Sequence, residues 1–256
     1  MPESNEQNNK PFYFTTLPNG WVVGRFRALE AMAGLIHAVT TRNGPDPAAT
    51  ARNVSAPVGQ LADALDLTQI AFCRQVHGNV ILPAERPGPT GEADGLVTNV
   101  PSLGLMGCSA DCPLILAADP VTGAVGMAHA SWRGTVRQIA AELILQLVTR
   151  FSVNTNDIVI CICPSAGVCC YEVGQEIRQA AVDGIGPYAE KFFQQRDEKL
   201  YFDLWAANTE QLIRSGVRTE NIHVAGVCTI CRNDLFPSRR ADGEAAGRFV
   251  AVVVQR

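Results

Sequence analysis

Three residues with metal-binding side chains stand at the ends of predicted strands. His77 and His129 each close a strand, and Cys112 immediately precedes another. Strand ends can meet at one edge of a sheet, where α/β folds place their sites, so residues far apart in sequence can gather there. Two imidazoles and one thiolate suit zinc and leave its fourth position for water or substrate, as catalytic zinc requires. Zinc would lower the pKa of the bound water towards about 7 and so supply a nucleophile at neutral pH.

The same residues support other interpretations. His77 and His129 could be ordinary buried or loop histidines, because their spacing is not a local metal-binding signature. Without a metal, Cys112 as nucleophile and His129 as base would form the dyad of a cysteine hydrolase. A non-enzymatic binding module is a third class, and it predicts no turnover to lose when Cys112 is replaced by alanine. His37 and His223 lie inside predicted strands and are expected to be structural.

Several basic side chains are candidates for an anion site. Arg133 falls in the first turn of a predicted helix, where unpaired amides and the helix dipole favour anions. A guanidinium there can hold phosphate through two hydrogen bonds. A surface ion pair is the commoner role of such an arginine, and closeness to His129 favours the functional one. Arg42, Arg239 and Arg240 are further candidates, for which solvated loop charge is the commoner role.

The remaining cysteines include one pair with a recognisable spacing. Cys228 and Cys231 form a CxxC motif, but a structural zinc site needs two more ligands. The cysteines that could supply them are Cys161, Cys163, Cys169 and Cys170. Cys161 and Cys163 share one face of a predicted buried strand and are expected to act as small core residues. A redox pair is the other interpretation of the CxxC motif, although it lacks the usual helix start.

Length and composition limit the class of protein. The chain has 256 residues, 47% of them hydrophobic, which suits one large domain with a sizeable core. Its net charge is −4, and no basic excess points to nucleic acid or an anionic membrane. Asn99, Asp111 and two prolines interrupt the most apolar stretch, residues 97–118, so no membrane span is predicted.

Residues 1–12 are mostly polar and are predicted to be a disordered lead-in to one catalytic domain at 13–256. The nine cysteines accompany no export signal and are expected to stay reduced, so the predicted location is the cytoplasm.

The elements that must position these side chains are mixed α and β. Apolar patterns predict strands over residues 21–26, 36–41, 70–76, 93–99, 103–107, 113–118, 123–128, 157–163, 222–227 and 249–254. Helices are predicted over residues 61–65, 132–150, 174–182 and 203–215. Ser131 and Asp203 are expected to cap two of these helices, and Gly216 to end the last. Residues 44–57 and 85–92 are predicted loops, because they are rich in glycine and proline.

Seven motifs, in order along the chain, match those of a known family. They are Gln75-Val-His-Gly78, Ala93-Asp-Gly95, Cys108-Ser-Ala-Asp-Cys112, Ala128-His-Ala-Ser-Trp-Arg-Gly134, Cys169-Cys-Tyr-Glu-Val-Gly174, Phe202-Asp-Leu204 and Cys228-Thr229. From about Thr40 onwards the chain resembles the bacterial YfiH-like, laccase-domain family of purine nucleoside phosphorylases, also called polyphenol oxidase or peptidoglycan editing factor. The chain differs from the family's usual sequence at residues 43–55, 131, 163–164 and 239–243. These differences leave the expected metal ligands intact and affect the rim of the site, which is expected to select the substrate.

The resemblance implies a single-domain α+β protein with α/β/β/α layers and mixed sheets. It implies zinc held by His77, Cys112 and His129. It also implies phosphorolysis of purine nucleosides, including methylthioadenosine, with phosphate as co-substrate, and deamination of adenosine. In that chemistry Arg133 would hold phosphate, with Arg42, Arg239 and Arg240 as further candidates. Asp111, next to Cys112, is a candidate acid–base residue or, as plausibly, a turn residue that caps backbone amides.

The family's other names imply two alternatives. A multicopper oxidase needs about ten histidines to hold its coppers, whereas this chain has four. Oxidation of polyphenols is therefore not expected as the main activity, although copper could occupy the zinc site adventitiously. Editing of a peptidoglycan precursor would fit the cysteine-hydrolase interpretation of Cys112 and His129. The family's fold resembles that of a bacterial toxin deamidase that uses Cys and His.

Overall fold

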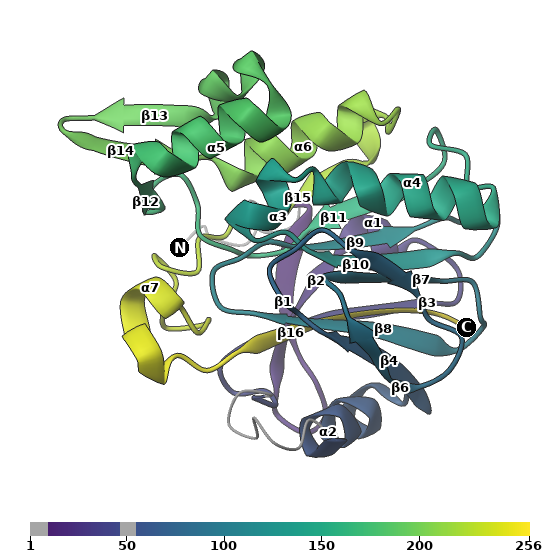
Figure 1. Cartoon of the computed structure of the whole chain (residues 1–256). Helices are drawn as coiled ribbons and strands as arrows, with labels where there is room; N and C mark the ends of the chain where they lie inside the picture. The colour runs from purple at the N-terminus through teal and green to yellow at the C-terminus, as the bar shows by residue number, and fades with distance from the viewer. Residues whose placement is uncertain (1–9, 47–54) are drawn as a thin grey trace.

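Two mixed β-sheets stack face to face and form the centre of the molecule. The computed structural model describes residues 10–46 and 55–256. Helix α2 (Ser55–Leu65) covers the outer face of one sheet, and α4 (Ile139–Phe151) and α6 (Leu204–Arg214) cover the outer face of the other (Figure 1). The predicted α/β/β/α layering with mixed sheets is confirmed, and it resides in one compact body.

The first sheet has seven strands. Its order is β1 (Phe12–Thr16), β2 (Val22–Phe26), β3 (Leu35–Thr40), β16 (Phe249–Gln255), β8 (Leu103–Ser109), β4 (Gln69–Arg74) and β6 (Gly88–Glu92). The pairs from β1 to β8 are antiparallel, whereas β4 runs parallel to both β8 and β6.

The second sheet has six strands. Its order is β15 (Ile222–Val224), β11 (Val159–Ile162), β9 (Leu114–Ala118), β10 (Val125–His129), β7 (Gly95–Thr98) and β5 (Ile81–Pro83). The two outermost pairs are parallel, and the inner pairs are antiparallel.

The inner strands are continuous apolar runs because both of their faces are covered. All five residues of β9 are buried. Successive side chains of a strand point to opposite faces. Leu114 and Leu116 accordingly pack between the two sheets, while Ile115 and Ala117 pack under α4. Such double burial removes the polar alternation expected of a half-exposed strand.

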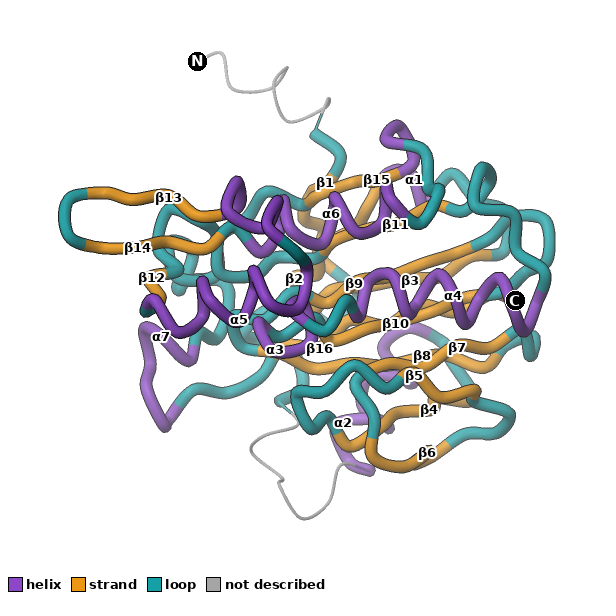
Figure 2. Tube along the Cα trace, turned by 45° about the horizontal axis from the view of Figure 1, so that its top comes forward, coloured by secondary structure: helices purple, strands orange, loops and turns teal. Residues whose placement is uncertain are grey.

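The remaining elements lie at one end of the sandwich. A small antiparallel sheet of β12 (Glu172–Val173), β14 (Lys199–Phe202) and β13 (Phe193–Arg196) projects there, as both views show (Figure 2). The helices at this end are α3 (Trp132–Val136), α5 (Gln175–Ile185), a 3-10 helix at Pro187–Phe192 and the short α7 (Arg239–Asp242), which lies near β12. The short helix α1 (Arg27–Glu30) lies between β2 and β3 in the chain. Within the described residues, no helix has the length and hydropathy needed to cross a membrane.

The long helix predicted over residues 132–150 is wrong, because the chain breaks into α3 and α4. Gln138 adopts a left-handed conformation, with φ at 61°, between the two helices. The break lets Val136 pack against α5 while Ile139 packs on the second sheet, which one straight helix could not do. The Asn79 side chain donates to the carbonyl of Arg137 and satisfies a group that the break exposes.

Two predicted loops also differ from the structure. Residues 88–92 form edge strand β6, and Pro89 is tolerated there because the outer side of an edge strand needs no ladder hydrogen bond. Helix α2 begins at Ser55, inside the loop predicted over 44–57, of which residues 47–54 lie outside the described residues. Residues 1–9 of the predicted lead-in lie outside them too. The caps predicted at Ser131 and Asp203 are confirmed, each accepting a hydrogen bond from a first-turn amide.

Candidate metal centre

His77, Cys112 and His129 meet where the chain passes between the two sheets. His77 lies in the passage from β4 to β5, and Cys112 in the passage from β8 to β9. His129 is the last residue of β10. One ligand atom from each of the three lies within 4.8 Å of the other two. The predicted convergence of strand ends therefore involves both sheets rather than the edge of one.

Asp94 positions both histidines. It lies between β6 and β7, in a third passage from the first sheet to the second, and it is fully buried. Its Oδ1 is 2.9 Å from Nδ1 of His129 and accepts from the backbone N–H of His77 at 2.9 Å. Its Oδ2 accepts from the N–H of Gly78 at 2.6 Å. A carboxylate on Nδ1 fixes the ring and leaves Nε2 free for a metal.

The turns that carry the ligands hold unusual backbone conformations. His77 has φ at 60° and Asp111, next to Cys112, has φ at 91°. Left-handed conformations are uncommon for residues other than glycine and persist where the surroundings fix them. The Gln75 side chain holds the His77 turn to the end of β8 by bonding both backbone groups of Cys108. The two turns are thus tied to each other without any metal.

Electrostatics favour an ionised pair in the centre. Burial opposes ionisation of Cys112, but the charge and hydrogen bond of His129, together with His77, lower the pKa of the thiol from 9.0 to about 7. Burial likewise opposes protonation of His129, but Cys112 and Asp94 raise its pKa from 6.5 to about 9. Burial would raise the pKa of Asp94, and the bonds from His129, Gly78 and His77 outweigh it and lower that pKa.

The donor set fits a catalytic zinc ion. One thiolate and two imidazoles provide three ligands of the types zinc prefers. The site is open on one side, because His77 is exposed, Cys112 half-buried and His129 buried. Asp94 supplies the outer hydrogen bond that orients a metal-bound histidine. Copper accepts the same donors, so the residues by themselves define a divalent-metal site.

Asp111 is bonded to the segment that carries residues 229 and 240. Its Oδ1 accepts from the Thr229 hydroxyl at 2.7 Å, and its Oδ2 accepts from the backbone N–H of Arg240 at 2.8 Å. Both carboxylate oxygens are therefore occupied, one by the Thr229 side chain and the other by the Arg240 backbone. The arrangement matches the turn-capping alternative for Asp111 more closely than the acid–base one.

The four arginines differ in their partners. Arg42 pairs with Asp242 and donates to the carbonyl of Asn233. Arg239 lies 3.5 Å from Glu244.

Arg240 donates to the carbonyl of Glu172 and stacks on Tyr171. Arg133 is exposed and stacks on Trp132, and no acidic side chain within the described ranges pairs with it. Arg133 is thus the arginine whose charge is most available to an anion.

Arg133 also lies beside the metal-binding turn. A Cβ placed on its neighbour Gly134 would come within 2.8 Å of the carbonyl oxygen of Gly78. The start of α3 therefore packs directly against the residue that follows His77. This contact supports the expected closeness of the arginine to the metal ligands.

Asp94 is the functional residue that sequence reasoning missed. In the sequence it stands only as part of the Ala93-Asp-Gly95 motif, inside the strand predicted over residues 93–99, with no local signal of its role. Its partners lie at positions 77, 78 and 129, which only the tertiary structure brings together. A buried carboxylate next to two metal-binding histidines is the signal that a structure provides.

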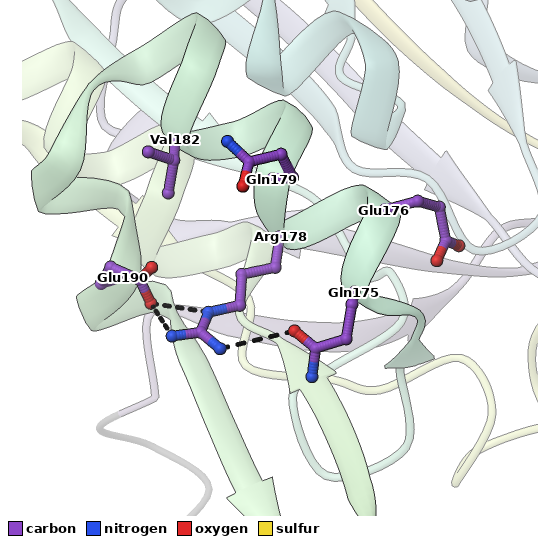
Figure 3. A pocket seen from close by; sticks show the side chains of 6 residues that line it. All are labelled: Gln175, Glu176, Arg178, Gln179, Val182 and Glu190. Carbon is purple, nitrogen blue, oxygen red and sulfur yellow. Dashed lines mark hydrogen bonds and ion pairs between the residues drawn. The ribbon is translucent and has the colours of Figure 1, made fainter.

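A surface pocket elsewhere on the molecule offers no comparable chemistry. It lies on α5 and the following 3-10 helix (Figure 3). Arg178 spans it, pairing with Glu190 at 2.7 Å and donating to Gln175 at 3.4 Å. The charge of Arg178 is therefore already matched by Glu190, and none of the lining residues belongs to either candidate metal-binding group.

Comparison with known proteins gives consistent matches. A family model described as multi-copper polyphenol oxidoreductase laccase matches residues 38–256. Purine nucleoside phosphorylase YlmD of Geobacillus stearothermophilus is 33% identical over 204 residues, covering 75% of this chain and 74% of that protein. A purine nucleoside phosphorylase of Deinococcus radiodurans is 33% identical over 248 residues, covering 95% and 88%. The crystal structure of the hypothetical protein YfiH from Bacillus licheniformis aligns with a TM-score of 0.84 at 26% identity, covering 95% of this chain and 99% of that one.

Proposed function

The chain belongs to the multi-copper polyphenol oxidoreductase laccase family, and from that membership we propose that it is a zinc-dependent purine nucleoside phosphorylase. The proposal extends to phosphorolysis of methylthioadenosine and to deamination of adenosine. The observation that carries it is the open site of His77, Cys112 and His129. We place the reaction in the cytoplasm, where nine free cysteines would remain reduced.

Phosphorolysis assigns separate tasks to residues of this chain. Arg133, exposed beside the His77 turn, would hold phosphate through paired N–H donors. A phosphate oxygen then bonds to C1′ of the ribose while the bond from C1′ to the base breaks. The electron pair of that bond passes to the purine, which takes up a proton, so the products are ribose 1-phosphate and free base.

Deamination would use the same site with water in place of phosphate. The oxygen of water adds to C6 of adenosine. The bond from C6 to the amino nitrogen then breaks, and ammonia leaves. A bound divalent metal would supply an activated water at neutral pH. The carboxylate of Asp94 holds the His129 ring in place during either reaction.

The family's description names copper, but this chain has only four histidines with which to bind several copper ions. A multicopper centre requires about ten imidazoles. His37 is buried in β3, where its Nε2 accepts from the backbone N–H of Phe26, and His223 lies in β15. Over residues 10–46 and 55–256 neither joins a metal-binding group. We therefore propose zinc as the resident ion, with copper as an adventitious occupant.

One assay panel tests the proposal. Purified protein of known metal content is incubated with adenosine, with and without phosphate, and the products are separated chromatographically. We expect adenine only when phosphate is present and inosine in either case. Methylthioadenosine should release adenine only with phosphate. Cys112→Ala and His129→Ala should form none of these products.

Cys73→Ser is the matched control, because this half-buried cysteine belongs to neither metal-binding group. It should retain both activities. Zinc-loaded protein that turns over none of adenosine, inosine, guanosine and methylthioadenosine would contradict the phosphorylase assignment.

A second candidate function rests on the arrangement of three neighbouring side chains, Cys112, His129 and Asp94. The thiol lies beside a histidine that a buried carboxylate orients, which is the arrangement of a cysteine hydrolase. Such an enzyme could remove a wrong amino acid from a peptidoglycan precursor.

Removal of the metal separates the two functions. A strong chelator should abolish nucleoside turnover, because it removes the ion. It should preserve or increase release of an amino acid from a cell-wall peptide, since zinc would no longer occupy the thiolate.

A further inference from the structure

Four cysteines from two distant segments form a second cluster of sulfur atoms. Cys169 and Cys170 precede β12, and Cys228 and Cys231 follow β15. One Sγ atom from each lies within 4.8 Å of the other three. The Sγ of Cys231 is 3.6 Å from that of Cys169 and 3.4 Å from that of Cys170. None of these residues belongs to the centre at Cys112.

The spacing of the sulfurs suits one tetrahedral ion. With Zn–S bonds of about 2.3 Å, the edges of a tetrahedron of sulfurs measure roughly 3.8 Å. The cluster is about that size, and it is too small to enclose a multinuclear iron–sulfur centre. Four cysteines around one ion are the ligand set of structural zinc sites, in which no position stays open for a substrate.

The protein also provides backbone donors to one of the sulfurs. Cys228 Sγ accepts from the backbone N–H of Gly167 at 3.3 Å, and the N–H groups of Ile230 and Cys231 point to it as well. The N–H of Arg232, the residue after the CxxC motif, bonds the carbonyl of Cys228 at 2.9 Å and closes the turn. Hydrogen bonds of this kind orient and stabilise a thiolate that binds a metal.

A cation would resolve the electrostatic conflict within the cluster. Thiolates this close repel one another, so the four cannot ionise together unless positive charge lies among them. Zinc supplies that charge and binds the deprotonated form.

We propose that Cys169, Cys170, Cys228 and Cys231 hold a structural zinc ion, a second metal site separate from the candidate catalytic one. The ion would join the segment before β12 to the segment after β15. Nucleoside chemistry does not enter this inference, so it stands or falls independently of the proposed function.

The ion would also fix the surroundings of Cys112. Thr229 lies inside the CxxC motif and donates to Asp111, the residue before Cys112. On the other side of the cluster, Tyr171 follows Cys170 and lies under the guanidinium of Arg240. A metal that anchors both segments would therefore hold two parts of the wall around the catalytic site.

Metal analysis with X-ray absorption tests the proposal. Full-length protein is purified under reducing conditions without chelator and its metal measured by mass spectrometry. We expect two zinc ions per chain, one for each group. Cys112→Ala should keep one, and its absorption spectrum should show four sulfur neighbours at about 2.3 Å. Cys231→Ser should keep the other, with a shell of mixed nitrogen and sulfur.

Cys73→Ser is the control and should retain both ions, because Cys73 lies outside both groups. The Cys112→Ala measurement leaves all four cysteines intact, so it holds even if Cys231→Ser folds poorly. Loss of all zinc from Cys112→Ala would overturn the proposal, and so would nitrogen in its remaining shell. A disulfide between Cys231 and either Cys169 or Cys170 in protein with one zinc would do the same, as would iron in place of zinc.

Discussion

Asp94 shows how much of a candidate metal centre can depend on a residue that is not itself one of the candidate ligands. Its two oxygens accept from the turn that carries His77 and contact the ring of His129. Both histidines thus share one anchor, and displacement of that anchor would move two of three ligands at once.

Replacing Asp94 with asparagine should weaken zinc binding. The His129 ring and the His77 N–H bond one oxygen of Asp94, and the Gly78 N–H bonds the other. An amide has one acceptor oxygen, so its NH2 group would face a donor on one of these two sides. Loss of a residue that hydrogen-bonds a metal ligand typically lowers the metal affinity about 10- to 100-fold, and we expect a loss of that order here. Competition with a zinc chelator measures the change.

Asp119→Asn is the control for loss of a buried carboxylate. Asp119 accepts from Thr122 in the turn between β9 and β10 and contacts neither histidine. The zinc affinity of the Asp119→Asn variant should equal that of the wild-type protein. Equal affinity in the Asp94 variant would show that the other contacts suffice to place the ligands.

Metal-free protein should have an unusually reactive Cys112. Its pKa lies at about 7 rather than 9.0, so the thiolate fraction rises as the pH rises through about 7. Alkylation followed peptide by peptide with mass spectrometry should show this midpoint for Cys112. Cys73, whose pKa burial raises to about 12, should react slowly over the same range.

His129→Ala should move the alkylation midpoint of Cys112 upwards, because it removes the positive partner. A wild-type midpoint near 9 would mean that the two side chains are not coupled in solution.

The candidate ligands could be named from the sequence, whereas the contacts that support them could not. His77, Cys112 and His129 carry metal-binding atoms at recognisable strand ends, and Ser131 and Asp203 have local capping signals. Asp94 has no such signal, because its role arises from hydrogen bonds to distant segments. The CxxC motif was visible in the same way, but only the fold selects Cys169 and Cys170 over Cys161 and Cys163 as its neighbours.

At the scale of elements, the division between α3 and α4 positions the metal-binding turn. The apolar periodicity of residues 136–147 is real, and periodicity alone cannot reveal that its first member packs on a different layer. Because α3 is separate from α4, its first turn can lie against Gly78. The layering itself came from the resemblance to a family rather than from the periodicity.

Replacing Gly134 with alanine should disturb the metal centre. A Cβ at this position would lie 2.8 Å from the Gly78 carbonyl oxygen, so α3 or the His77 turn must move. We expect zinc affinity to fall by on the order of tenfold, as for other disturbances of ligand support. Isothermal titration of metal-free protein measures it.

Gly59→Ala is the matched control, because this helical glycine in α2 has open space around its Cβ. Zinc binding should not change, and stability should stay equal or rise by up to about 1 kcal/mol. Zinc affinity of Gly134→Ala equal to that of the wild type would show that the α3 contact is not needed for the turn.

At the scale of the whole molecule, the core between the sheets carries the fold. Leu105 of β8 and Leu116 of β9 both lie fully buried in the same cluster, one from each sheet. The two sheets therefore share one interior, and we expect them to unfold together rather than one after the other.

Replacing Leu116 with alanine should lower the free energy of unfolding by about 2–5 kcal/mol, because it leaves a cavity between the sheets. Denaturation followed by both fluorescence and circular dichroism should give coincident transitions. Val121→Ala, at a side chain that is 74% exposed, should change stability by less than about 0.5 kcal/mol. Separate transitions for the two probes would show that the sheets unfold independently.

The chain passes from the first sheet to the second near His77, Asp94 and Cys112, and all three passages converge on the metal centre. Any sliding of one layer over the other must therefore pull the donor atoms apart. A bound ion would link the two sheets, and its dissociation rate would report how often they move apart. In hydrogen–deuterium exchange, amides of β8 and β9 should accordingly be better protected with the ion than without it.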